Sequence, residues 1–133
     1  MAADKLDLEI TTPERRVIAE TVDEVVLPGT QGYLGVLPGH APLLTGLNAG
    51  EVAYRAGGKE HFVAVSAGFA EILANRVSIL ADTAERAEEI DLERARRSLD
   101  RAQKALAAHD DVLAAQARLL RALARIQVRE RVG

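Results

Sequence analysis

Apolar and polar residues alternate with a period of two through residue 84, and turn-forming residues interrupt the alternation at short intervals. Leu6, Leu8 and Ile10 fall on one side of the first alternating run. Between later runs, Gly57-Gly58 and Asn75-Arg76 have the composition of tight hairpin turns. Some eight or more short runs of this kind predict an antiparallel β-sandwich or flattened barrel.

The spacing changes after residue 84, and the rest of the chain has the pattern of two amphipathic helices. From Glu85 onward there is no Pro, and the only Gly is Gly133. Apolar residues recur at alternating steps of three and four, which places them on one helix face. The two series are Leu92, Ala95, Leu99, Ala102, Leu106 and Val112, Ala115, Leu119, Ala122, Ile126. With residues 107–111 as the connection, we predict an antiparallel α-helical hairpin over residues 85–133 after an all-β sandwich over residues 1–84.

The predicted hairpin has little apolar surface to bury, because Ala occupies every second position of both series. Small side chains remove less area from water, so the helices are expected to pack closely but weakly. Asp91 stands where an N-cap residue of the first helix is expected. We therefore predict a marginal hairpin that is separable from the sandwich.

Composition and charge exclude several classes of protein. The net charge of -3 and the pI near 5.6 argue against a nucleic-acid binder. The absence of Cys excludes disulfides and thiolate metal sites. No stretch approaches the roughly 18 apolar residues of a membrane span, and the start of the chain lacks the pattern of a signal peptide. Residues 1–84 carry a net charge of -5 and residues 85–133 one of +2, so the two parts can attract each other.

No catalytic or metal-binding pattern is present. The turn over residues 38–43 resembles a phosphate loop but lacks the GK[ST] signature and a following helix. His40, His61 and His109 fall in three separate predicted elements, which argues against a metal site. Ser66 and Ser78 lie in strand contexts without a nucleophile elbow. A small β-sandwich hydrolase is therefore disfavoured.

Four arginines form a basic stripe on the second predicted helix: Arg118, Arg121, Arg125 and Arg129 follow steps of three, four and four. The usual interpretation of such a stripe is a solvated helix face. Guanidinium groups can also bind phosphate or carboxylate with two parallel hydrogen bonds. The sequence leaves both interpretations open.

Three runs of residues, in order, resemble the epsilon subunit of the F-type ATP synthase. They are PGTQGYLGVLPGHAPL over residues 28–43, GFAEILANRVSIL over residues 68–80 and IDLERA over residues 90–95. The resemblance covers essentially the whole chain. It implies an N-terminal β-sandwich of about ten strands and a C-terminal antiparallel helix pair, in agreement with the division at residue 84.

The resemblance implies a non-catalytic rotor subunit in the central stalk of a proton-translocating ATP synthase. The expected partners are the gamma subunit, the membrane c-ring and the alpha/beta catalytic head, with no nucleic acid. The expected location is the cytoplasmic face of the bacterial inner membrane, peripherally through the complex. In the family the hairpin folds down on the sandwich or extends and blocks ATP hydrolysis. Gly39, His40 and the four stripe arginines are the candidate partner-binding residues.

Some members of this family bind ATP on the folded-down hairpin, so the resemblance also implies a candidate nucleotide site. No cofactor is expected to be required, and ATP is a regulatory ligand in this hypothesis. The candidate residues are Glu85, Ile90, Asp91, Arg94, Ala95, Arg121 and Arg125. The structural alternative is that Asp91 only caps its helix. An alternative for the whole protein is a free-standing nucleotide-sensing module that acts on another partner.

Overall fold

The computed structural model describes residues 4–132, so residues 1–3 and 133 of the predicted domain ranges lie outside it. Among the described residues the chain forms ten strands, one short 3-10 helix and two α-helices. The strands are β1 (Leu6–Thr11), β2 (Arg16–Val22), β3 (Glu24–Gly29), β4 (Gly32–Val36), β5 (Leu43–Leu47), β6 (Gly50–Ala56), β7 (Lys59–Val65), β8 (Gly68–Leu73), β9 (Arg76–Ala81) and β10 (Ala84–Arg86). The helices are η1 (Ala87–Glu89), α1 (Leu92–Ala107) and α2 (Val112–Glu130).

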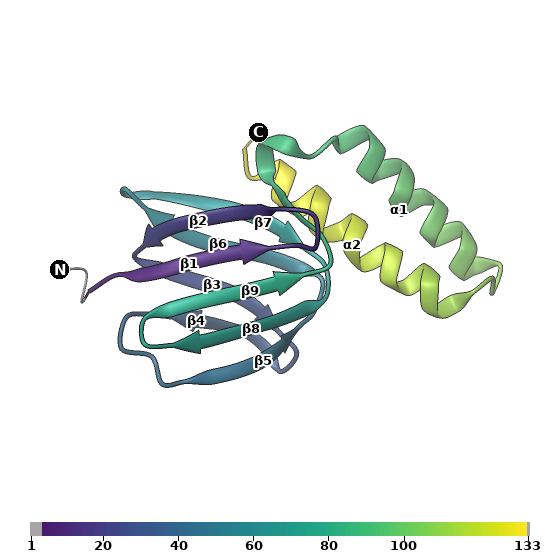
Figure 1. The fold of residues 1–133 in the computed structure, drawn as a ribbon. Coiled ribbons are helices and arrows are strands. Elements are labelled where there is room, and N and C mark those ends of the chain that lie inside the picture. The colour runs from purple at the N-terminus through teal and green to yellow at the C-terminus, as the bar shows by residue number, and fades with distance from the viewer. Residues whose placement is uncertain (1–3, 133) are drawn as a thin grey trace.

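The strands form one continuous hydrogen-bonded path that is folded into two layers. The order is β10-β7-β6-β3-β5-β8-β9-β1-β2, with β4 paired to β3. Strands β5, β8, β9, β1 and β2 form the front layer in Figure 1, and the others lie behind them. At the fold between the layers, β3 and β5 pair only through Gly29 and Leu47. The predicted sandwich is confirmed.

Period-two alternation explains the core. Leu6, Leu8 and Ile10 are all buried, in one cluster with the inward side chains of the other strands. The strand path ends at β10 and β2, and side chains close the sandwich on the side where these two end strands lie. The Tyr54 hydroxyl donates to Glu20 at 2.7 Å, and Arg86 Nη2 donates to the Val17 carbonyl oxygen at 2.6 Å.

The C-terminal residues form the predicted helix pair, which lies beyond one end of the sandwich (Figure 1). Ala95 and Ala102 of α1, and Ala115 and Ala122 of α2, are fully buried, whereas the leucines of both predicted series are half-buried. The small residues let the helices approach closely. α1 packs on α2, and α2 in turn packs on β6, β7 and η1.

The segment that joins the sandwich to the helix pair has regular secondary structure. The predicted division after residue 84 falls at the first residue of β10, which pairs with β7 from Ala84 opposite Val65 to Arg86 opposite Val63. The η1 helix then leads to α1. The hairpin turn that the sequence placed at Asn75-Arg76 lies one residue earlier, with positive φ at Ala74 and Asn75.

Gly68 is required where β8 begins, opposite Ala81 of β9. A Cβ atom added to Gly68 would collide with the backbone carbonyl oxygen of Leu80. We expect Gly68→Ala to lower the free energy of unfolding by about 1–3 kcal/mol, measured by urea denaturation. The matched control is Gly35→Ala, whose new Cβ would lie 3.9 Å from the Glu24 carboxylate, at ordinary contact distance. Equal stability of the two variants would contradict the steric requirement.

Candidate functional site

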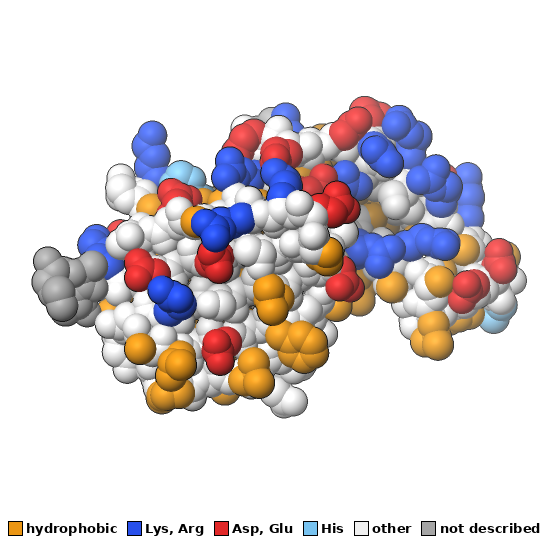
Figure 2. All heavy atoms as spheres, viewed as in Figure 1, with side chains coloured by type: hydrophobic (Ala, Val, Ile, Leu, Met, Phe, Trp, Pro, Cys, Tyr) orange, Lys and Arg blue, Asp and Glu red, His pale blue; other side chains and the backbone are white. Residues whose placement is uncertain are grey.

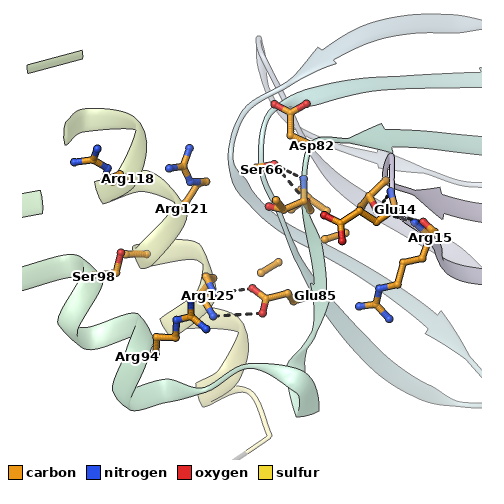
Figure 3. A pocket seen from close by; sticks show the side chains of 16 residues that line it. Glu14, Arg15, Ser66, Asp82, Glu85, Arg94, Ser98, Arg118, Arg121 and Arg125 are labelled. Carbon is orange, nitrogen blue, oxygen red and sulfur yellow. Dashed lines mark hydrogen bonds and ion pairs between the residues drawn. The ribbon is translucent and has the colours of Figure 1, made fainter. Parts of the chain in front are cut away.

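A cavity of about 410 Å³ lies between the helical hairpin and the end of the sandwich that faces it. Figure 3 shows its two walls, with arginines projecting from the helices on one side and polar side chains from strand ends and turns on the other. Five arginines and three carboxylates line it, so the cavity carries a net positive charge. Its charged residues are Glu14, Arg15, Asp82, Glu85, Arg94, Arg118, Arg121 and Arg125.

Helical periodicity builds the first wall. Arg118, Arg121 and Arg125 recur at steps of three and four on α2, so they share a face, and Arg94 and Ser98 are likewise four residues apart on α1. The close approach of the two helices brings these side chains to one cavity. Arginine is suited to such a site because its planar fork binds phosphate or carboxylate with two hydrogen bonds.

The sandwich supplies the second wall from residues that are distant in the sequence. Thr12, Glu14 and Arg15 come from the turn between β1 and β2, and Thr83 from the passage between β9 and β10. Ser66 is buried there, and its hydroxyl accepts a hydrogen bond from the Thr83 backbone amide at 2.7 Å. Ser66 therefore ties this wall to Thr83.

One ion pair joins the two walls. Arg125 Nε donates to Glu85 Oε1 at 2.6 Å, and Arg125 Nη2 donates to Oε2 at 3.3 Å (Figure 3). Both side chains are largely buried, so water screens the pair less than it would at the surface. The attraction predicted from the opposite charges of the two parts is present at this point. An anionic ligand at Arg125 would compete with the Glu85 carboxylate.

Arg15 forms a second ion pair, with Glu89 in the short helix η1 that leads to the hairpin. Its guanidinium Nη2 lies 3.0 Å from Glu89 Oε1 in η1. The hydrogen bond and charge of Arg15 hold the pKa of Glu89 below its usual range, and Glu89 raises the pKa of Arg15. Both groups are therefore charged at neutral pH, and Arg15 is a fixed positive charge at the cavity.

The structure brings together four of the seven residues proposed for nucleotide binding: Glu85, Arg94, Arg121 and Arg125 line the cavity. The other three do not line it. Asp91 caps α1, since its carboxylate accepts the Arg94 backbone amide at 3.1 Å. Ile90 is buried with Ala64, Ala87 and Val128, and Ala95 is buried within the helix pair.

The residues proposed for partner binding lie in two places. Arg118 joins Arg121 and Arg125 at the cavity, whereas Arg129 lies one turn beyond it on α2 and is half-buried. The Gly39 amide donates to the Asn75 side chain at 2.7 Å, so the loop of Gly39 and His40 is tied to the turn between β8 and β9. That turn is at the end of the sandwich away from the helices (Figure 1).

Sequence reasoning missed the contribution of the sandwich to the cavity. Arg15 follows a Thr-Pro-Glu turn, and nothing in the local pattern separates it from an ordinary surface arginine. It also missed a pair between Glu51 and Arg131 at the C-terminal end of α2. A signal for α2 was present, because Arg121 and Arg125, and likewise Ala124 and Val128, are four residues apart and mark a second face.

A second surface is apolar and lies on the outer side of the front layer. Leu44, Phe69, Leu73 and Leu80 are each more than half exposed, and Phe69 pairs directly with Leu80 across β8 and β9. Figure 2 shows hydrophobic side chains gathered on this lower front part of the sandwich. A group of exposed apolar side chains of this kind typically marks a binding site for a protein partner.

The cavity and the apolar face are suited to binding a ligand or a partner. Within residues 4–132, no group of three or more His, Cys, Asp or Glu side chains is placed to hold a metal ion. No helix in that range is both long and apolar enough to cross a membrane. The cavity offers charged donors to an anion, and the apolar face offers area to a partner.

Comparison with known proteins gives two family matches that together span most of the chain. The model described as "ATP synthase, Delta/Epsilon chain, beta-sandwich domain" matches residues 5–87. The model described as "ATP synthase, Delta/Epsilon chain, long alpha-helix domain" matches residues 88–130.

Individual relatives agree with these matches. The chain is 56% identical to the ATP synthase epsilon chain of Nitratidesulfovibrio vulgaris and 55% identical to that of Solibacter usitatus. Each alignment spans 93 residues, 70% of this chain and 69% of the relative. A chain in the cryo-EM structure of the Euglena gracilis mitochondrial ATP synthase OSCP/F1/c-ring assembly superposes with a TM-score of 0.78 at 26% identity, over 97% of this chain and 81% of that chain.

Proposed function

This chain belongs to the Delta/Epsilon family of ATP synthase chains, as a non-catalytic epsilon chain of the F-type central stalk, and on that premise we propose that its sandwich couples the rotor while its hairpin regulates ATP hydrolysis. The complex to which such chains belong carries out ATP synthesis and proton transport. One observation carries the proposal: the sandwich has a continuous core of its own, whereas the hairpin is attached to it through a single helix.

The apolar face is the surface we assign to the gamma subunit. Leu44, Phe69 and Leu80 are 70%, 63% and 62% exposed, which gives a partner substantial apolar area to bury. The loop of Gly39 and His40 lies at the end of the sandwich far from the helices, and we assign that end to the c-ring. The chain is then held peripherally at the cytoplasmic face of a bacterial inner membrane.

The hairpin is the proposed regulatory element. In the docked state that the structure describes, Arg125 is engaged by Glu85, while Arg118 and Arg121 face the cavity. Detachment would free these side chains, and with Arg129 they form a basic helix face suited to acidic segments of the catalytic head. Docked and detached hairpins would thus be the permissive and inhibitory states.

ATP is the proposed ligand of the cavity. Its phosphates carry the charge that Arg94, Arg118 and Arg121 are placed to bind, and the volume of about 410 Å³ is in the range of small-molecule sites. Because the cavity exists only when both walls are together, a bound anion favours the docked hairpin. High ATP would therefore relieve inhibition.

Truncation tests regulation by the hairpin. We expect a chain ending at Ile90, which keeps β10 and η1, to bind gamma but to give a severalfold higher rate of ATP hydrolysis by the cognate catalytic head than the full chain. The rate of hydrolysis is measured with each chain reconstituted in parallel. Equal rates with equal gamma binding would mean that the hairpin is not inhibitory and that the chain acts through its sandwich.

Substitution on the apolar face tests the gamma contact. Phe69→Ser is expected to weaken gamma binding by about 2 kcal/mol, roughly 30-fold in Kd, because the ring would lose a buried contact. Leu113→Ser on α2 is the matched control, since Leu113 is 82% exposed but lies on the hairpin. Failure of the unaltered chain to bind gamma would instead favour a free-standing sensing module.

Calorimetric titration tests the nucleotide proposal. We expect ATP to bind the full chain and Arg121→Gln to weaken that binding by roughly tenfold, as expected for the loss of a charged hydrogen bond. The control is Lys104→Gln, whose ammonium pairs with Asp100 on the exposed side of α1. No heat at millimolar ATP would remove the nucleotide proposal and leave the rotor assignment in place.

A further inference from the structure

The C-terminal end of α2 meets a buried carboxylate on the sandwich. Glu51 lies at the start of β6 and is only 7% exposed. Arg131, the residue after α2, approaches it with both arms of its guanidinium: Nε donates to Oε2 and Nη2 to Oε1, each at 2.9 Å. These two residues are 80 positions apart, so the pair joins the end of the hairpin to the sandwich.

Further contacts surround this pair. The Arg131 guanidinium carbon lies 4.9 Å from the centre of the Phe62 ring, a cation-π distance. One turn earlier on α2, Val128 is fully buried in a cluster with Ala64, Ala87 and Ile90. The end of α2 therefore combines a two-pronged ion pair, an aromatic contact and apolar packing within one turn.

Arg131 and Glu51 differ in the free-energy cost of breaking the pair. Arg131 is about half exposed and can be hydrated where it stands. Glu51 is buried under the end of α2, and a buried carboxylate without a partner is costly. Loss of the Arg131 charge therefore favours movement of α2 away from Glu51, which lets water reach the carboxylate.

The hairpin contacts the sandwich mainly through α2. Among the described residues, α1 makes its extensive contacts with α2 alone, while α2 contacts β6, β7 and η1. The helix pair itself is joined by alanines, so α1 follows α2. The attachment of about 40 residues thus depends on the C-terminal half of α2, which carries Arg125 and Val128, and on Arg131 just after it.

We propose that Glu51, Phe62 and Arg131, together with the buried Val128, form a latch that holds the hairpin on the sandwich, and that opening of this latch is the step that frees the hairpin. The latch is separate from the cavity, since none of its four residues lines the cavity. Its role in regulation rests on the proposed function, whereas its role in holding the hairpin does not.

The test measures hairpin position in the full chain, free of any other subunit. The sequence has no Cys, so Lys59→Cys at the start of β7 and Gln116→Cys on α2 give two exposed sites for spin labels. Pulsed electron-electron double resonance then gives the distribution of distances between the label on the sandwich and the label on the hairpin. We expect Arg131→Gln to raise the ratio of detached to docked hairpin about tenfold.

Companion variants separate the latch from a general loss of charge. Glu51→Gln keeps the shape of the side chain and should shift the ratio in the same direction, and the double variant should add little to either single change. Arg131→Lys keeps the charge but not the two-pronged geometry, so it should give an intermediate shift. Lys104→Gln, which breaks a pair inside α1, should leave the distribution unchanged.

An unchanged distance distribution in Arg131→Gln would overturn the latch. Arg131 is exposed in part and lies outside the core of the sandwich, so this variant is expected to fold even if Glu51→Gln does not. The result is independent of ATP hydrolysis. A hairpin that detaches in Arg131→Gln, together with equal hydrolysis rates for full and truncated chains, would keep the latch and reject the inhibitory role.

Discussion

The docking of α2 on β6 and β7 is the contact on which the arrangement of the two parts depends. The cavity lies along this surface, and both arginine pairs, Arg125 with Glu85 and Arg131 with Glu51, cross it. Without this contact the two helices would still pair through their alanines, and the sandwich would keep its core. The cavity would lose one of its walls, and Glu51 would lose its cover.

Side-chain size explains why this contact is weaker than the core of the sandwich. Inside the sandwich, residues such as Leu6, Ile10 and Ile72 are fully buried, and each contributes about 1.5–3 kcal/mol. Where α2 meets the sandwich, the buried apolar cluster is small: Val128 packs with Ala64, Ala87 and Ile90, and each alanine methyl contributes only about 0.8 kcal/mol. Charged pairs consequently carry a larger share of the hairpin's attachment than of the sandwich's stability. A few substitutions or one bound anion can then change the balance between docked and detached hairpins.

This difference suits the proposed combination of coupling by the sandwich and regulation by the hairpin. Rotor coupling needs a rigid body with a fixed apolar face, which the ten-stranded sandwich provides. Regulation needs two arrangements of the hairpin that differ by only a few kcal/mol, which the small apolar contact at Val128 and the two arginine pairs allow. A ligand in the cavity and a partner for the free arginine face of α2 would act in opposite directions on the same equilibrium, because each binds only one of the two arrangements.

The sequence by itself determined the elements and much of the cavity's helical wall. Alternation at Leu6, Leu8 and Ile10 fixes which strand face is buried, since the side-chain period of a strand is two. The two apolar series with steps of three and four, which contain Ala95 and Ala102 in one and Ala115 and Ala122 in the other, likewise specify a helix pair. The same helical period places Arg121 and Arg125 on a common face. These are local periodicities, and a short stretch of chain expresses them fully.

Only the tertiary structure decided which charges meet and which motif residues reach the cavity. Glu51 and Arg131 are 80 positions apart, and their pairing depends on which edge of the sheet α2 contacts and on its rotation about its own axis. Arg15 reaches the cavity because the turn between β1 and β2 lies at the end of the sandwich that faces the helices. Ile90 and Ala95 belong to the same motif as Arg94 but are buried for packing, because a motif specifies neighbours in sequence while burial depends on neighbours in space.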